Sequence, residues 1–170
     1  SEDGTSVAAQ SGTASSTITV TPVGDTPTVA DITTDEDTQS GAIVIDRNVT
    51  DSTEVSHFQI SAISNGSLYL NDGTTIINDG DYITYAQGQA GLRFTPDANS
   101  NLAGSFAVAA SEDGSSVAAQ SGTASSTITV TPVGDTPTVA DITTDEDTQS
   151  GAIVIDRNVT DSTEAVSYTH

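Results

Sequence analysis

The sequence repeats itself with a period of 110 residues. Residues 1–54 and 111–164 are identical except at one position, where Thr5 corresponds to Ser115. A helical solenoid repeat is much shorter than this, whereas a small globular domain has about this length. We therefore expect one domain per repeat. Because the 170 residues hold one complete period and about half of a second, we interpret the chain as a window on a longer tandem array.

The pattern within one period predicts an all-β sandwich. Short segments rich in Val, Ile and Thr alternate between apolar and polar residues, and Gly, Asn, Asp and Pro separate them. In "STITVTP", Ile128 and Val130 share one face of the strand and threonines occupy the other. The same rule places Phe58, Ile60 and Ala62 on one face. The expected strands lie at 16–22 and its repeat 126–132, and at 42–45, 57–63, 67–70, 74–77, 82–85, 91–96, 104–111 and 116–120.

The segment "VTPVGDTPTV" is the expected joint between repeats. Proline and glycine interrupt the strand pattern there, at Pro22, Gly24 and Pro27. This joint predicts three parts: the last strands of a preceding repeat (1–24), a complete domain (25–133) and the first part of a following repeat (134–170). Half a sandwich cannot easily bury its own core. We therefore expect the partial repeats to pack on the central domain or to complete each other between molecules, through head-to-tail or strand-swapped contacts.

The charge balance narrows the set of partners. The chain has 24 acidic residues, three arginines and no lysine, for a formal net charge of −21. Nucleic acids and anionic membrane surfaces are bound through Lys and Arg, and both partners are therefore excluded. No run of 18 apolar residues predicts a membrane span. Cysteine is absent, so disulfides do not stabilise the domain. The acidic surface either keeps the protein soluble or binds cations, and bound metal would supply a stabiliser.

Several motifs together resemble one protein family. "TVTPVGDTP" resembles a strand followed by an "NDAP" joint, "TTDEDTQSG" resembles an "EDT" segment, and "FTPDANSNLAGSF" follows later in the same period. The chain resembles the tandem cadherin-like, immunoglobulin-like repeats of giant bacterial surface adhesins of the RTX-adhesin or biofilm-associated type, exported by type I secretion. The resemblance implies a Greek-key immunoglobulin/cadherin-like β-sandwich at the bacterial cell surface. One departure is "GDTP", which lacks the family's Asn-Asp pair and thereby one side-chain oxygen at the joint.

The resemblance also implies calcium at the joints. Calcium takes six to eight oxygen ligands, mainly from carboxylates and carbonyls. The expected ligands are Glu2, Asp3, Asp25, Asp35, Glu36 and Asp37 at the upstream joint, and Glu112, Asp113, Asp135, Asp145, Glu146 and Asp147 at the downstream joint. Strand alternation points Asp35 and Asp37 away from Glu36. Glu36, Glu146 and the linker aspartates are the first choice, on the resemblance. The alternative is that "SEDG" and "TDED" are solvated turns.

Nothing in the sequence predicts an enzyme. His57 and His170 accompany no nucleophile elbow and no zinc-ligand spacing, and cysteine is absent. Two functions then compete. The first is a spacer that extends an adhesin from the cell surface in adhesion and biofilm formation, with calcium fixing the angle between neighbouring repeats of the same chain. The second is a cadherin-like module that binds extracellular polysaccharide, for which Tyr82 and Tyr85 are candidate sugar contacts or simply core residues.

Overall fold

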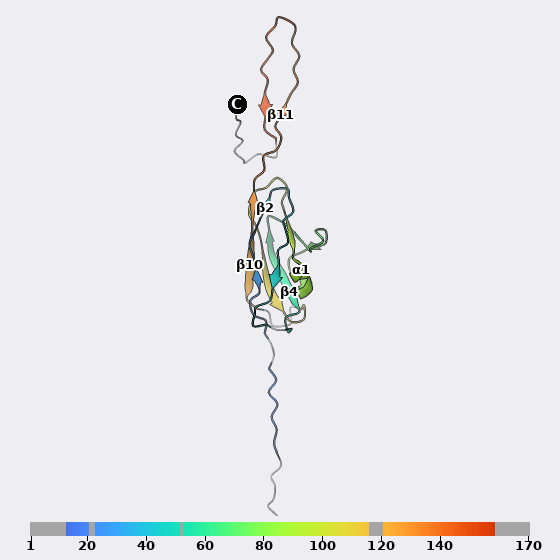
Figure 1. Cartoon of the computed structure of the whole chain (residues 1–170), viewed down its shortest axis with the longest axis vertical. Coiled ribbons are helices and arrows are strands. Elements are labelled where there is room, and N and C mark those ends of the chain that lie inside the picture. The colour runs from blue at the N-terminus through green and yellow to red at the C-terminus, as the bar shows by residue number, and fades with distance from the viewer. Residues whose placement is uncertain (1–12, 21–22, 52, 116–120, 159–170) are drawn as a thin grey trace, which may run out of the picture.

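Two facing β-sheets form the middle of the chain in the computed structural model, which describes residues 13–20, 23–51, 53–115 and 121–158. The larger sheet has the order β2-β10-β9-β4-β7, in which β2 and β10 are parallel and the other neighbours antiparallel. Its strands are β2 (Ile32–Asp35), β4 (His57–Ser64), β7 (Tyr82–Thr84), β9 (Gly104–Ser111) and β10 (Thr123–Thr131). Figure 1 shows these strands running along the length of the central body.

The smaller sheet has three antiparallel strands in the order β6-β5-β8. They are β5 (Gly66–Tyr69), β6 (Ile76–Ile77) and β8 (Arg93–Pro96). A short two-stranded ladder pairs β1 (Thr28–Val29) with β3 (Ile45–Asp46). The "NDG" turn at 71–73 joins β5 to β6, as its sequence predicts. The all-β sandwich expected from the alternating pattern is therefore confirmed.

The core lies between the two sheets and depends on three aromatic rings. Phe58, Phe94 and Phe106 are fully buried, and aliphatic side chains from both sheets surround them. Ile128 and Val130 of β10 point into this core while their threonine neighbours face solvent, as the alternation predicts. All residues of the core cluster lie between 43 and 130.

The predicted face of β4 is wrong at Ala62. Phe58 and Ile60 are buried, but the register with β9 shifts between Ser61 and Ser64, and Ala62 has a φ of 54°. This β-bulge turns Ala62 toward solvent and brings Ile63 against the core.

One short helix lies between the expected strands at 82–85 and 91–96 and includes Tyr85, the last residue of the first of them. Helix α1 (Tyr85–Ala90) begins at the N-cap Thr84, whose side chain accepts a hydrogen bond from Gln87 N–H while the Gln87 side chain accepts from Thr84 N–H. This is a capping box, which satisfies two amides at the start of the helix. Gly88 faces Phe58 so closely that a Cβ there would lie 2.7 Å from the ring. The helix therefore needs glycine at this position.

The expected strands at 16–22 and 42–45 differ from the structure. Residues 13–20 form no strand and are exposed, whereas the identical sequence in the second copy forms β10. In the other segment Ile43 makes an isolated bridge to Leu92, and the strand itself starts only at Ile45. The expected strand at 116–120 lies outside the described residues.

The partial second copy keeps its local structure without the rest of a domain. Strands β11 (Thr138–Val139) and β12 (Ile155–Asp156) pair in the register that β1 and β3 have 110 residues earlier. The turn also recurs, with φ of 55° at Asp37 and 58° at Asp147. No counterpart of β2 forms at 142–145, because the strand that would pair with it is not beside it.

Within the described residues the partial copies do not pack on the central domain, so the first of the two expected alternatives is wrong. Residues 13–20 are exposed throughout, and residues 134–157 are exposed except for a half-buried Asp135. Figure 1 shows the two segments extending from opposite ends of the central body. Contact between molecules stays a prediction.

Candidate functional site: the two ends of the domain

The chain enters and leaves the central domain at opposite ends of β10. A Cβ on Gly24 would lie 3.2 Å from Ala110 Cβ, and Ala110 O accepts a hydrogen bond from Ser121 N, two residues before β10 starts. We call this the upstream end. Val133, two residues after β10 finishes, marks the downstream end. The predicted acidic ligands are divided between these two ends.

Glu36 is the central residue of the downstream end. The parallel pairing of β2 with β10 places Asp35 opposite Thr131, so the acidic turn at 35–37 lies beside the departing chain. Glu36 is buried, its Oε1 accepts a hydrogen bond of 2.7 Å from Val133 N–H, and its own N–H donates to Thr131 O. Asp35 and Asp37 are exposed, as the alternation predicts. A buried carboxylate thus fixes the first residues of the linker.

Asp37 connects the acidic turn to the loop between β8 and β9. Its Oδ1 accepts a hydrogen bond of 2.8 Å from Asn99 N–H, and its φ of 55° lies in the left-handed region. Asp135 follows on the linker and is half-buried. Asp35, Glu36 and Asp37 therefore lie at the downstream end of the domain, and Asp135 follows two residues after Val133 on the linker.

Asp25 and Asp51 lie together at the upstream end. Asp25 N–H donates to both carboxylate oxygens of Asp51, at 3.0 and 3.1 Å, and Thr50 Oγ1 donates to Asp25 Oδ2 at 2.5 Å. Asn48 completes the loop by accepting from Thr50 and donating to Thr26 O. Sequence reasoning missed Asp51. The available signal was the run of Asn48, Thr50 and Asp51, whose short polar side chains favour turns that bind backbone amides.

Glu112 also lies at the upstream end, in the turn that follows β9. Ser56 Oγ donates to its backbone oxygen, and Ser56 N–H donates to the preceding Ser111 O. The side-chain oxygen Oε1 of Glu112 is buried and has no hydrogen-bond partner among the described residues. Asp113 is exposed, and its carboxylate accepts from Ser115 N–H within the same turn. A buried carboxylate oxygen without a donor is a position where a cation would be stabilising.

The grouping of acidic residues expected from the sequence is wrong. Asp35, Glu36 and Asp37 were assigned to the upstream joint with Asp25, and Glu112 and Asp113 to the downstream joint with Asp135. The topology reverses both assignments, because β2 runs parallel to β10 toward the downstream end and β9 runs antiparallel to it toward the upstream end.

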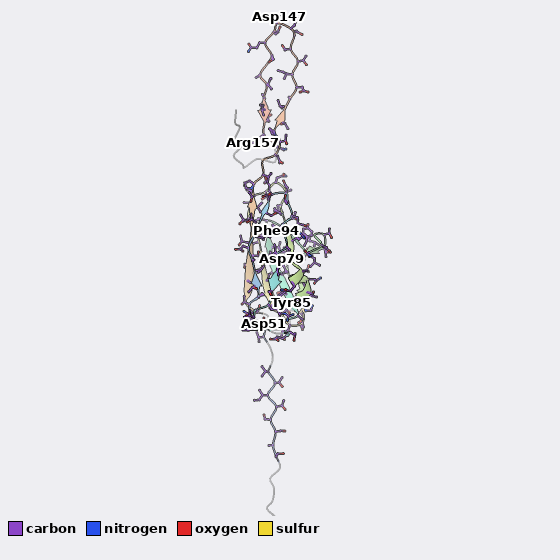
Figure 2. The ribbon with its side chains drawn as sticks, viewed as in Figure 1. Asp51, Asp79, Tyr85, Phe94, Asp147 and Arg157 are labelled. Atoms are coloured by element: carbon purple, nitrogen blue, oxygen red, sulfur yellow. The ribbon has the colours of Figure 1, made fainter. Side chains whose placement is uncertain are left out.

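The remaining predicted ligands lie elsewhere. Asp145, Glu146 and Asp147 form the exposed tip of the partial second copy, which Figure 2 shows far from the central body at Asp147. Glu2 and Asp3 lie outside the described residues. Within the described part of the chain, no three His, Cys, Asp or Glu side chains come close enough to hold one metal ion.

The two candidate sugar contacts have different environments. The Arg47 guanidinium lies 3.5 Å from the Tyr85 ring centroid, and Tyr85 Oη donates to Asp46 Oδ1 at 3.1 Å. Partial burial and the hydrogen bond to Asp46 raise the pKa of Tyr85. One face of Tyr85 is therefore covered. Tyr82 instead lines a cavity of about 210 Å³ together with Asp81 and Gln87.

Asp72 shows how the surface acids are otherwise used. Its carboxylate accepts hydrogen bonds from Thr74 N–H and from both Thr75 N–H and Oγ1, which stabilise the turn between β5 and β6. The bonds from Thr75 lower the pKa of Asp72 to about 2. This acid is a turn residue, as are Asp79 and Asp81, which also accept backbone amides.

Comparison with known proteins gives little additional information. No family model and no curated protein matches the chain. Among solved structures, the solution NMR structure of a conjugate transposon protein (residues 27–141) from Bacteroides vulgatus is similar, with a TM-score of 0.40 and 15% identity over 60% of this chain and 78% of that chain. A similarity of this size supports no argument about function. Among the residues that the structure describes, no helix has the length and hydropathy needed to cross a membrane.

Proposed function

We propose that the chain is part of the extender of a bacterial surface adhesin, in which nearly identical β-sandwich copies follow one another and hold a binding region away from the cell. The observation that carries this proposal is that the chain enters and leaves the domain at opposite ends of β10. Nine residues of strand span about 30 Å. Each copy therefore adds at least that length, and tandem copies form a rod instead of folding back.

Calcium is proposed to fix the angle between neighbouring copies. Among the described residues, each end of the domain offers carboxylates but no complete metal site, whereas calcium needs six to eight oxygens. In an array, the downstream end of one copy meets the upstream end of the next across the linker. Such a joint would combine Asp35, Glu36, Asp37 and Asp135 with Asp161, the repeat equivalent of Asp51 that lies outside the described residues.

The residues present fit a hard divalent cation. The acidic residues at the two ends supply carboxylate oxygens, which calcium prefers. Two carboxylates 4 Å apart repel each other by about 1 kcal/mol in water, and a divalent ion between them removes this repulsion. At a calcium concentration ten times the dissociation constant, each site adds about 1.4 kcal/mol of stability. Several joints in series would then stiffen the array.

The calcium stoichiometry of proteins with one, two and three complete copies tests this proposal. If calcium binds at the joints, the number of tight binding sites follows the number of joints. Isothermal titration calorimetry should then find no tight site with one copy, the sites of one joint with two copies and the sites of two joints with three copies. Glu36→Gln should weaken binding at the joint that follows its copy, while Asp72→Asn, a change of the same charge away from the joints, should not. Equal binding per copy, including the single copy, would contradict a joint site.

A second candidate function is binding of extracellular polysaccharide. The cavity beside Tyr82 favours it, because an aromatic residue lines this cavity together with the polar residues Asp81 and Gln87, a combination suited to a sugar ring. If this function is correct, a single copy binds a glycan in titration calorimetry and Tyr82→Ala abolishes the binding. Tyr85→Ala should then have little effect on the glycan, because Arg47 covers that ring. A single copy that binds no glycan leaves the extender as the function.

A further inference from the structure

Tension along an array of repeats would reach the complete copy through two strands that are direct neighbours. The chain enters the domain at Gly24, close to Ala110, and leaves it at Val133, at the opposite end of β10. After Gly24 the chain passes through β1 into β2, and β2 lies beside β10 in the larger sheet (Figure 1). A pull on the two ends of the domain therefore acts on β2 and β10 in opposite directions.

The direction of these strands decides how the pull is resisted. β2 and β10 are parallel, with four residue pairs that run from Ile32 opposite Ile128 to Asp35 opposite Thr131. The upstream chain pulls β2 by its first residue and the downstream chain pulls β10 by its last, so the two strands are driven to slide past each other along their axes. Because the ladder bonds are evenly spaced between the strands, all the pairs carry this load together. A ladder that is opened from one end would instead lose its pairs one at a time.

Side-chain hydrogen bonds extend the β2–β10 ladder at its upstream end. Ser126 Oγ donates to Ala30 O at 2.8 Å, and Thr127 N–H donates to Asp31 Oδ1 at 2.7 Å. Ser126 is fully buried, so water does not compete for its bond. Both bonds join the same two segments of the chain as the ladder, so sliding of β2 along β10 must break them as well.

Glu36 keeps the pull aligned with the ladder at its downstream end. Its N–H donates to Thr131 O at 2.9 Å, and its Oε1 accepts a hydrogen bond of 2.7 Å from Val133 N–H. The start of the linker is thus held beside the end of β2. A pull from the following copy therefore enters β10 along the strand.

The contacts that precede β2 are shorter and more exposed. β1 and β3 pair at two positions only. Asp25 N–H donates to the carboxylate of Asp51, and Asn48 Nδ2 donates to Thr26 O, and these bonds are exposed. Exposed hydrogen bonds exchange readily with water, so we expect these contacts to yield first and to pass the tension on to β2.

We propose that the β2–β10 ladder, with the added bonds of Ser126 and Asp31, is a mechanical clamp that keeps each copy folded while tension passes along the array. This further function rests on the proposed extender, because an extender transmits tension between the cell and the binding region. Forced unfolding is governed by the rate of unfolding, so the contacts that break in the first step set the resistance. The clamp consists of protein atoms only and does not depend on calcium at the joints.

Pulling single molecules of the whole chain between two pairs of attachment points tests the clamp. The chain has no cysteine, so two introduced cysteines are unique handles. Val23→Cys with Gly134→Cys loads β2 and β10 from opposite ends, whereas Thr38→Cys with Gly134→Cys loads both strands at the downstream end, and all three positions are exposed. At the same pulling speed, we expect a higher unfolding force in the first geometry, where the pairs break together.

A matched pair of substitutions identifies the bonds that carry the load. Asp31→Ala removes the acceptor of Thr127 N–H in the clamp, and Asp79→Ala removes the acceptor of Ile63 N–H outside it. Each substitution removes one exposed carboxylate that accepts a backbone amide, so both should cause similar losses in urea unfolding. At constant force in the first geometry, Asp31→Ala should raise the unfolding rate roughly threefold to tenfold, and Asp79→Ala should change it by less than about twofold.

The outcomes separate the clamp from the extender. A higher force in the first geometry, together with a faster rate in the Asp31 variant alone, supports the clamp. Equal forces in the two geometries, or equal effects of the two substitutions on the rate under force, would overturn it. Either failure would leave the length that each copy adds unchanged, and calcium binding at the joints is measured separately. The extender proposal is therefore decided by its own experiments.

Discussion

The repeat offers a matched pair of substitutions in which sequence context is constant and only burial differs. Ile45 and Ile155 have the same neighbours in sequence and occupy equivalent strands, β3 and β12. Ile45 is fully buried in the core, whereas Ile155 is 59% exposed. Ile45→Ala removes three carbons from a packed interior, which costs about 2.4 kcal/mol of transfer free energy at about 0.8 kcal/mol per carbon. The cavity left behind raises the loss to about 3–4 kcal/mol.

Ile155→Ala should cost less than about 0.5 kcal/mol, because it changes a surface side chain. Urea unfolding of the two variants and the wild type gives the free energies of unfolding directly. In thermal unfolding of the same proteins, we expect the Ile45 variant to lose roughly 10 °C or more in Tm and the Ile155 variant to have the Tm of the wild type. Equal destabilisation by both substitutions would show that the second copy is part of the cooperative domain, and would refute the division into one folded copy and two open segments.

Three further predictions rest on single contacts. Glu36→Ala should destabilise the domain by about 1–3 kcal/mol in urea unfolding, because Val133 N–H loses its acceptor, whereas Glu146→Ala in the exposed repeat should have no effect. The pKa of Asp72 is about 2 in the folded chain, below its usual 3.8. The ionised carboxylate therefore contributes to stability above pH 3.8, and this contribution is lost as the pH falls toward 2. Asp72→Asn should accordingly reduce the fall in Tm between pH 4 and pH 2. Because the pKa of Tyr85 is raised, its contribution is present below the usual tyrosine pKa and is lost as the pH rises through the raised value. Tyr85→Phe should therefore remove an ionisation above the usual tyrosine range from an ultraviolet titration.

Local patterns predicted the strands well where alternation and turns are both strong. The strand at 104–111 has the bounds that the sequence indicated, and Ile128 and Val130 face the core as expected. The bulge at Ala62 could not be predicted from the alternating pattern, because a bulge adds one residue to a strand without requiring a characteristic residue type. Helix α1 is also hard to predict, since six residues give less than two full turns of periodicity and the capping box of Thr84 and Gln87 is its main mark.

The candidate site depended on information that local patterns do not contain. The acidic residues were identified from the sequence, but they were grouped by their order along the chain. Their true placement depends on the parallel pairing of β2 with β10, across 96 residues, which carries Glu36 to the downstream end. Pairing between distant strands is decided by packing of the whole sandwich. Whether the acids at either end bind calcium stays a prediction.

The central claim is that calcium between adjoining ends turns the repeats into a rigid rod. Small-angle X-ray scattering of a protein with three complete copies, recorded with excess calcium and then with chelator, tests it most directly. We expect a larger maximum dimension and radius of gyration with calcium, with scattering typical of a straight rod, and a shorter, broader distribution once the metal is removed. Scattering curves that superimpose under both conditions would contradict the claim.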